Sequence, residues 1–205
     1  MGDDATDAGE ESWARTLLSA PVFQTLLLMF SVTLAGLSIG GPGQGIVVVA
    51  LDKPLLDPWW EPITATYGHV NWDHFLSNAV VITVFGSAVA YTTTTLRFHA
   101  FFLTTGILSS MAHVFISNAL SDFPTLILGS SGAGFALIGY VIALLLSGGL
   151  NWGGSKRVAL LVIGGGAAVL AVLFSPPESA ILSHFVGALL GLLAGWLHIL
   201  GWSIR

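Results

Sequence analysis

The side chains able to do chemistry in this chain are few and stand inside apolar sequence. The 205 residues contain no cysteine, which excludes disulfides, thiolate catalysis and cysteine-based metal sites. Ser130 and Ser131 lie in a glycine-rich run, GSSGAG, that opens one apolar segment, and His184 opens a later one. A serine hydroxyl becomes a nucleophile when a neutral imidazole accepts its proton. The pattern predicts Ser131 as a nucleophile and His184 as its general base.

A second group of residues could stabilise the oxyanion that forms when such a serine attacks a carbonyl. Ser131 falls in the first turn of its predicted helix, where backbone N–H groups have no intrahelical partner and the helix dipole is positive. His74 and Asn78 are four residues apart, so they share one helical face and both can donate from it. No carboxylate falls inside an apolar segment, so a dyad rather than a triad is predicted.

This chemistry requires two helices in close contact. Glycine occupies positions 129, 132 and 134 around the serines, and positions 187, 191 and 195 after His184. Rows of small residues let helix backbones approach each other in a membrane. We therefore expect the segment that begins at Gly129 to pack against the segment that carries His184. Taken alone, such glycine runs are equally typical of ordinary helix packing.

The composition is that of a membrane protein. Hydrophobic residues make up 54% of the chain, charged residues make up 8%, and the mean hydropathy is +0.85. No basic patch suited to nucleic acid occurs. Residues 1–20 are predicted to form a disordered cytoplasmic tail ahead of a membrane domain over residues 21–205. The tail carries Asp3, Asp4, Asp7, Glu10 and Glu11.

The apolar segments predict an all-α fold, a polytopic bundle of six transmembrane helices. They run approximately over residues 21–40, 74–92, 97–118, 129–149, 158–174 and 179–202, and the hydrocarbon core that each must cross is about 30 Å thick. Apart from Lys53, the lysines and arginines lie in the tail, the second and fourth loops and the C-terminus. This distribution predicts a multi-pass protein of the cell membrane with both termini in the cytoplasm.

The candidate residues fall at one predicted depth. His69, His74 and Asn78 lie around the start of the second segment, Ser131 at the start of the fourth, and His184 at the start of the sixth. All three segments descend from the exterior in this topology, so the groups converge in the outer part of the membrane. Polar groups inside a membrane are costly unless paired or hydrated, which makes these residues functional candidates.

Four other polar residues have simpler interpretations. A single serine in a membrane helix commonly bonds its own backbone, and we interpret Ser130 in this way. His113 and His198 are interpreted as packing partners whose hydrogen bonds are satisfied, and His99 as an interfacial residue.

Three motifs together resemble those of the rhomboid intramembrane serine proteases. Gly129-Ser130-Ser131-Gly132 resembles the GxSG signature of that family, His184-Phe185-Val186-Gly187 its last-helix His-x-x-Gly, and His69-x4-His74-x3-Asn78 its second-helix histidine and asparagine pattern. The motifs occur in order on the expected segments, and the resemblance covers residues 21–202.

The resemblance implies a protease that cuts transmembrane proteins in or beside the lipid bilayer, with no cofactor and no metal. Ser131 is the implied nucleophile and His184 the implied base. His74, Asn78 and the Ser131 amide would hold the oxyanion, while His69 would tie down the loop over the site. A mobile fifth helix would gate the substrate, and the implied supporting positions are Gly129, Gly132, Phe135 and Gly187.

Two positions depart from the family pattern. Many relatives have tyrosine four residues after the serine, packed on the catalytic histidine; here Phe135 keeps the ring and loses the hydroxyl. Many also have a Trp-Arg pair in the first loop, where this chain has Trp59-Trp60-Glu61. We expect the ring packing to survive, and the anchoring of the first loop is left open.

Two other functions stay open on the sequence. A non-catalytic rhomboid-like protein would bind or escort membrane helices, although such proteins typically lack the serine or the histidine. A small transporter or metal permease would use His69, His74, His113 and His184 as ligands, although the segments show no acidic or cysteine partner and no inverted repeat.

Overall fold

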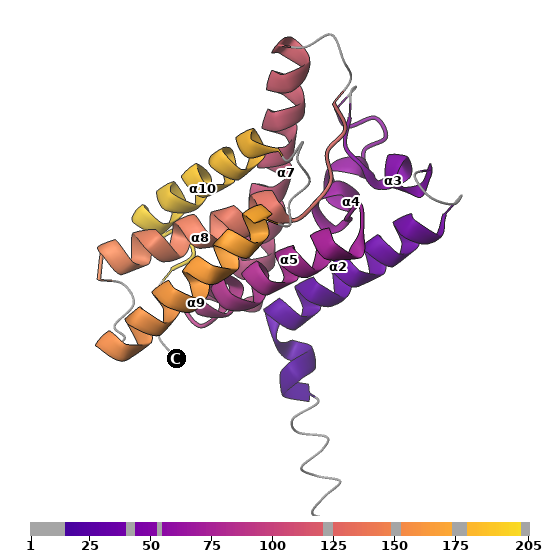
Figure 1. Cartoon of the computed structure of the whole chain (residues 1–205). Helices are drawn as coiled ribbons and strands as arrows, with labels where there is room; N and C mark the ends of the chain where they lie inside the picture. Colours follow the sequence, from indigo (N-terminus) through magenta and orange to yellow (C-terminus); the bar gives the residue numbers. More distant parts are fainter. Residues whose placement is uncertain are drawn as a thin grey trace, which may run out of the picture.

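The computed structural model describes residues 15–39, 44–52, 55–120, 125–148, 153–173 and 180–201. Within these ranges the chain is helical apart from loops and one isolated antiparallel bridge, between Leu51 and Ile127. The predicted all-α fold is confirmed (Figure 1). The helices are α2 (Pro21–Ser38), α3 (Gln44–Val49), α4 (Glu61–Tyr67), α5 (Trp72–Val81), the π-helix η1 (Ile82–Gly86), α6 (Ser87–Ala90), α7 (Thr95–Leu120), α8 (Ser131–Leu146), α9 (Gly154–Leu173) and α10 (Ile181–Trp196).

Three of the helical segments are long and apolar enough to cross a membrane. These are α2, the continuous stretch Trp72–Ala90 formed by α5, η1 and α6, and α7. The shorter apolar helices are α8, α10 and the Arg157–Gly166 part of α9. Each of the six predicted segments is therefore helical, but α8 and α10 have only 16 residues. Such a helix is about 24 Å long, less than the hydrocarbon core of about 30 Å.

The chain before α2 is more ordered than the sequence predicts. Residues 1–14 of the predicted tail lie outside the described residues, but residues 15–19 are helical, so the prediction of disorder is wrong for this stretch. A new helix then starts at Pro21, after Ala20 with an extended backbone (φ −72°, ψ 121°). Proline suits the first helical position because it has no N–H to leave unpaired there.

The central helix of the bundle is α8. Most of its residues are buried, and it contacts α10, α7, η1, α6 and α5. A helix that is apolar on all sides, as this one is, needs neighbours around its whole circumference. Leu137, Tyr140 and Leu144 of α8 join Phe101 and Phe102 of α7 in the main hydrophobic core.

The most extensive pairing of two helices is that of α8 with α10, which lie side by side in Figure 1. Gly187 lies against the backbone of Gly132, and one turn further on Gly191 lies against the backbone of Ala136. A Cβ atom at either Gly187 or Gly191 would overlap the carbonyl oxygen of the facing helix. The predicted close packing of these two segments is confirmed, and it is a contact of backbone against backbone.

The loop between α2 and α5 is anchored to the segment that leads into α8. Leu51 and Ile127 exchange two backbone hydrogen bonds, of 2.8 and 3.0 Å. The N–H of Gly129 donates to the carbonyl of Ala65 over 2.8 Å. These backbone bonds anchor the first loop, a point that the sequence left open.

Replacing Gly191 by valine should separate α8 from α10 and lower the free energy of unfolding by about 1–3 kcal/mol, the usual cost of overpacking. Gly165→Ala on α9 is the matched control, because a Cβ atom at Gly165 meets open space. Thermal unfolding of the purified protein in detergent should therefore show a lower Tm for the first variant only. Equal Tm values for the two variants would contradict the importance of the α8–α10 contact.

Candidate active site

Ser131 and His184 meet where the N-termini of α8 and α10 lie together. Ser131 is the first residue of α8, and His184 is in the first turn of α10. The Nε2 atom of His184 lies 2.9 Å from the Oγ atom of Ser131, although the two residues are 53 positions apart in the sequence. This distance is that of a hydrogen bond in which the imidazole can accept the hydroxyl proton.

An aromatic ring fixes the plane of the His184 imidazole. Phe135 follows Ser131 by one helical turn, and its ring is stacked on that of His184 with the centroids 4.4 Å apart and the planes 12° from parallel. The expected ring packing is therefore confirmed. Within the described ranges the carboxylates are Asp52, Asp57, Glu61 and Asp73, and none of them has a hydrogen bond to His184.

The first turn of α8 leaves its amides available to a ligand. Ser130 is the N-cap residue, but its side chain makes no capping hydrogen bond. Its carbonyl accepts the N–H of Gly134 over 2.8 Å, which starts the helical ladder. The N–H groups of Ser131 and Gly132 precede the first intrahelical donor, so the helix itself gives them no acceptor.

Our interpretation of Ser130 as a serine bonded to its own backbone is wrong. Its Oγ atom lies 3.1 Å from Nε2 of His69. Both nitrogens of that buried imidazole are used, because Nδ1 lies 3.0 Å from the Thr33 hydroxyl of α2. His69 therefore connects α2, the first loop and the start of α8, and Thr33 is a member of the site that the sequence analysis missed. A threonine inside an apolar segment was the available signal.

The hydrogen bonds around His69 favour one position of its ring proton. Burial holds the pKa of His69 well below its usual value, with a smaller contribution from His74, so the ring is neutral. The Ser130 N–H points at Nε2 over 3.5 Å, which favours the tautomer in which Nε2 is the acceptor. Nδ1 then carries the hydrogen and donates to the Thr33 hydroxyl, which in turn donates to the Tyr67 carbonyl over 3.5 Å.

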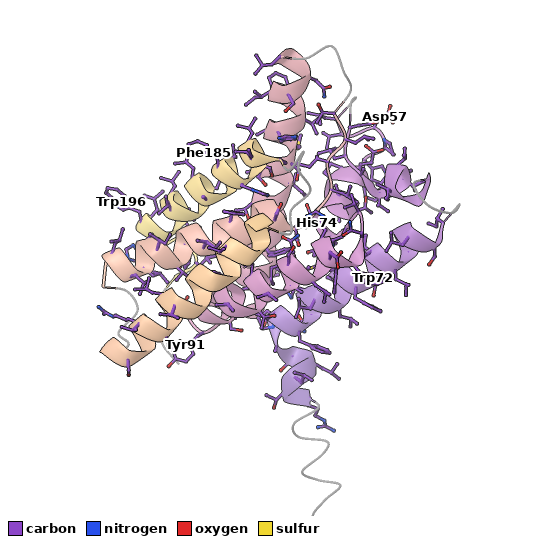
Figure 2. The ribbon with its side chains drawn as sticks, in the orientation of Figure 1. Asp57, Trp72, His74, Tyr91, Phe185 and Trp196 are labelled. Atoms are coloured by element: carbon purple, nitrogen blue, oxygen red, sulfur yellow. The ribbon has the colours of Figure 1, made fainter. Side chains whose placement is uncertain are left out.

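His74 lies directly beside the chain that enters α8. Asn71 caps α5 by accepting the His74 N–H over 2.8 Å, and Figure 2 shows the His74 side chain pointing into the interior of the bundle. Gly129 has a φ of +131°, and a Cβ atom there would lie 2.6 Å from the His74 ring. Glycine is thus required at position 129 both by its backbone and by the imidazole. Nδ1 of His74 is buried and has no protein partner among the described residues.

Asn78 is expected to donate to the oxyanion beside Ser131, but its buried side chain bonds the backbone instead. Its side-chain amide donates to the backbone carbonyl of His74 over 2.9 Å, and no hydrogen bond joins it to Ser131 in the described part of the chain. The amide has a second N–H that this bond does not use. The structure therefore brings His184 to Ser131 and His74 to Gly129. Asn78 is hydrogen-bonded to the backbone of His74 and not to Ser131.

His113 and His198 do not match their simple interpretations. His113 on α7 is half-buried, and its Nδ1 has no partner among the described residues, so it is not a satisfied packing residue. His198 is exposed after the end of α10, with Nδ1 2.8 Å from the Trp196 carbonyl. No three His, Cys, Asp or Glu side chains of the described ranges are grouped as metal ligands would be.

Glu61 is a buried carboxyl in the first loop that the sequence analysis noted only as a departure from the family. It begins α4 and is 7% exposed, and its Oε2 atom has no partner among the described residues. Burial raises the pKa of Glu61, and the nearby Asp52 carboxylate raises it further. The raised pKa reflects the free-energy cost of keeping an ionised carboxylate away from water.

The rhomboid domain profile matches residues 57–200, which include both members of the Ser131–His184 pair and more than half of the chain. The chain belongs to the rhomboid family. This rhomboid is 28% identical over 157 residues to rhomboid-like protein 11, chloroplastic, of Arabidopsis thaliana. The match covers 68% of the chain and 52% of that relative, so the chain spans about half of the relative's length. With three helices of spanning length, the rhomboid is a membrane protein.

Replacing Thr33 by valine should destabilise the rhomboid by about 1–3 kcal/mol, because it leaves the buried Nδ1 atom of His69 without its hydrogen-bond partner. Thr33→Ser keeps the hydroxyl and should retain most of the stability. Denaturant-dependent unfolding in mild detergent would measure both variants. If the serine variant lost as much stability as the valine variant, the methyl packing of Thr33 rather than its hydroxyl would be responsible.

Proposed function

We propose that this rhomboid is an intramembrane serine endopeptidase with a Ser131–His184 dyad. The observation that supports the proposal most directly is the 2.9 Å contact between His184 Nε2 and Ser131 Oγ at the paired N-termini of α8 and α10. A serine bonded to a neutral imidazole, beside unpaired helix amides, has the parts needed for acyl transfer.

The proposed reaction uses this pair twice. The Ser131 oxygen attacks the peptide carbonyl carbon as its proton passes to His184 Nε2, and the carbonyl oxygen becomes an oxyanion. His184 then returns the proton to the leaving amine nitrogen as the C–N bond breaks, which leaves an acyl-enzyme. Water, deprotonated by His184, cleaves the ester and restores the Ser131 hydroxyl. The Phe135 stack keeps the imidazole in the plane that both transfers need.

The oxyanion would be held by the Ser131 amide and by His74. Amides in the first turn of a helix point toward bound negative charge and add the positive end of the dipole. The His74 ring lies against Gly129, two residues before the nucleophile, and its Nε2 atom would be 3.0 Å from a Cβ atom at Gly129. Asn78 contributes by fixing the backbone of His74, and its second N–H is available to the substrate.

The short α8 and α10 support a site below the membrane surface. Each is about 24 Å long and cannot cross about 30 Å of hydrocarbon, so when its far end reaches the interface its N-terminus lies within the membrane. The segment over residues 125–130 would then enter the membrane ahead of Ser131. The first loop is hydrogen-bonded to this segment. At this depth Ser131 could attack peptide bonds that lie in or beside the bilayer.

The proposed substrates are transmembrane proteins with small residues at the cut and a helix that unwinds easily. They would reach the dyad past α9, which packs mainly on α5 and η1. Gly164 of α9 lies against the Phe85 ring, whereas Gly165 and Gly166 meet open space. The charge distribution supports a multi-pass protein of the cell membrane with cytoplasmic termini and a site open to the exterior.

Replacing either Ser131 or His184 by alanine should lower cleavage of a model transmembrane substrate by about 10⁴-fold or more, as loss of the nucleophile or its base does in serine hydrolases. A fluorophosphonate should label the wild-type protein at Ser131 and should not label Ser131→Ala. Ser147→Ala, at the opposite end of α8, is the matched control and should keep both activities. Substrate retention without cleavage or labelling by the wild-type protein would instead favour a non-catalytic binder of membrane helices.

Replacing His74 by alanine should lower kcat by about 10²–10³-fold with little change in KM, because the lost donor acts on the charge that develops in the transition state. Steady-state cleavage in detergent would separate the two constants. A rise in KM at constant kcat would show that His74 binds the substrate rather than the oxyanion.

A further inference from the structure

A groove on the outer surface of the bundle lies between α7 and α10, away from the dyad. It has a volume of about 360 Å³, and its walls include Ala100, Thr104 and Leu108 of α7 and Leu190 and Leu193 of α10. The groove is open to the surroundings, since Leu108 is 47% exposed and Leu193 is 53% exposed. Its lining is almost wholly apolar, with Arg97 as its one charged residue.

The groove has the length of one membrane leaflet. Arg97 lies at the beginning of α7, and Leu108 lies eleven residues later along the same helix. At about 1.5 Å per residue this is a distance of about 16 Å. Half of a hydrocarbon core of about 30 Å is nearly the same distance. With Arg97 at the headgroup level, the groove therefore extends to about the middle of the bilayer.

The guanidinium of Arg97 is fixed in place at the end of the groove. Its Nη1 atom donates to the carbonyl of Leu200 over 3.1 Å, and the hydroxyl of Thr93 donates to the same oxygen over 3.0 Å. Gly201, with a φ of +68°, makes room for this arrangement, because a Cβ atom there would lie 2.5 Å from Nη1. The guanidinium has further N–H donors that the Leu200 carbonyl does not use.

The described part of the chain brings no carboxylate to this position. Its acidic residues, Asp52, Asp57, Glu61 and Asp73, lie in the first loop or at the start of α5. That end of the bundle is separated from Arg97 by the full length of the Trp72–Ala90 helical segment. A fixed cation at the interface, above an apolar channel, is complementary to a molecule with a negative head and a hydrocarbon tail.

We propose that this groove binds an anionic phospholipid, with one acyl chain along α7 and α10 and the headgroup phosphate on Arg97. Guanidinium groups pair with phosphate oxygens through parallel N–H donors, and basic positions between membrane helices suit anionic headgroups. In the proposed topology this is a lipid of the cytoplasmic leaflet. The site is independent of the dyad, so it can be tested without any proteolytic measurement.

The test is native mass spectrometry of the full chain in detergent, titrated with dioleoyl phosphatidylglycerol and with dioleoyl phosphatidylcholine, which has the same acyl chains. The anionic lipid should bind about fivefold more tightly, as expected for one basic residue at the interface. Arg97→Gln should abolish this preference. Ala100→Phe, which fills the groove and keeps the charge, should weaken binding of both lipids, and inorganic phosphate should not compete.

Arg157→Gln is the matched control, because it removes one charge from the start of α9, outside the groove. It should keep the preference for phosphatidylglycerol. A preference that persists in Arg97→Gln, or binding of both lipids that is unchanged in Ala100→Phe, would overturn the proposal. So would a dimer of the chain that excludes both lipids and is disrupted by Ala100→Phe, since the groove would then be covered by a second copy.

Discussion

The contact on which the rest of the structure depends is the meeting of the α8 and α10 backbones. Gly187 against Gly132 brings the two helix axes closer than any side chain would allow. The same contact aligns the two N-termini, so that Ser131 and His184 lie at one level and 2.9 Å apart. In a membrane, where apolar side chains gain little from leaving lipid, such close packing is a main source of helix association.

The first loop and α8 form a second connected unit. The loop is joined to the chain before α8 by backbone hydrogen bonds at Leu51 and Ala65, and by the His69 imidazole between Thr33 and Ser130. Buried polar groups are costly when unpaired, so the hydrogen bonds of this network also fix the geometry of the loop and of the start of α8. The turn at Gly129 is held between this network and the His74 ring.

In the described chain no carboxylate has a hydrogen bond to His184. An ionised acid in a low-dielectric region requires compensating charge and hydrogen bonds, and its burial costs several kcal/mol in order of magnitude. Ring stacking by Phe135 orients the imidazole without a buried charge. The buried Glu61 lies instead in the first loop, where burial and Asp52 raise its pKa.

The sequence by itself determined the helical fold, the glycine contact between two segments and the pairing of Ser131 with His184, because these follow from composition, periodicity and spacing along one chain. Tertiary structure decided how those residues are used. Ser130 bonds His69 rather than its own backbone, Thr33 joins the network, and Asn78 donates to the His74 carbonyl. The partners of His69 are 36 and 61 positions away, and a hydrogen bond over such a separation depends on the packing of whole helices, which no local pattern encodes.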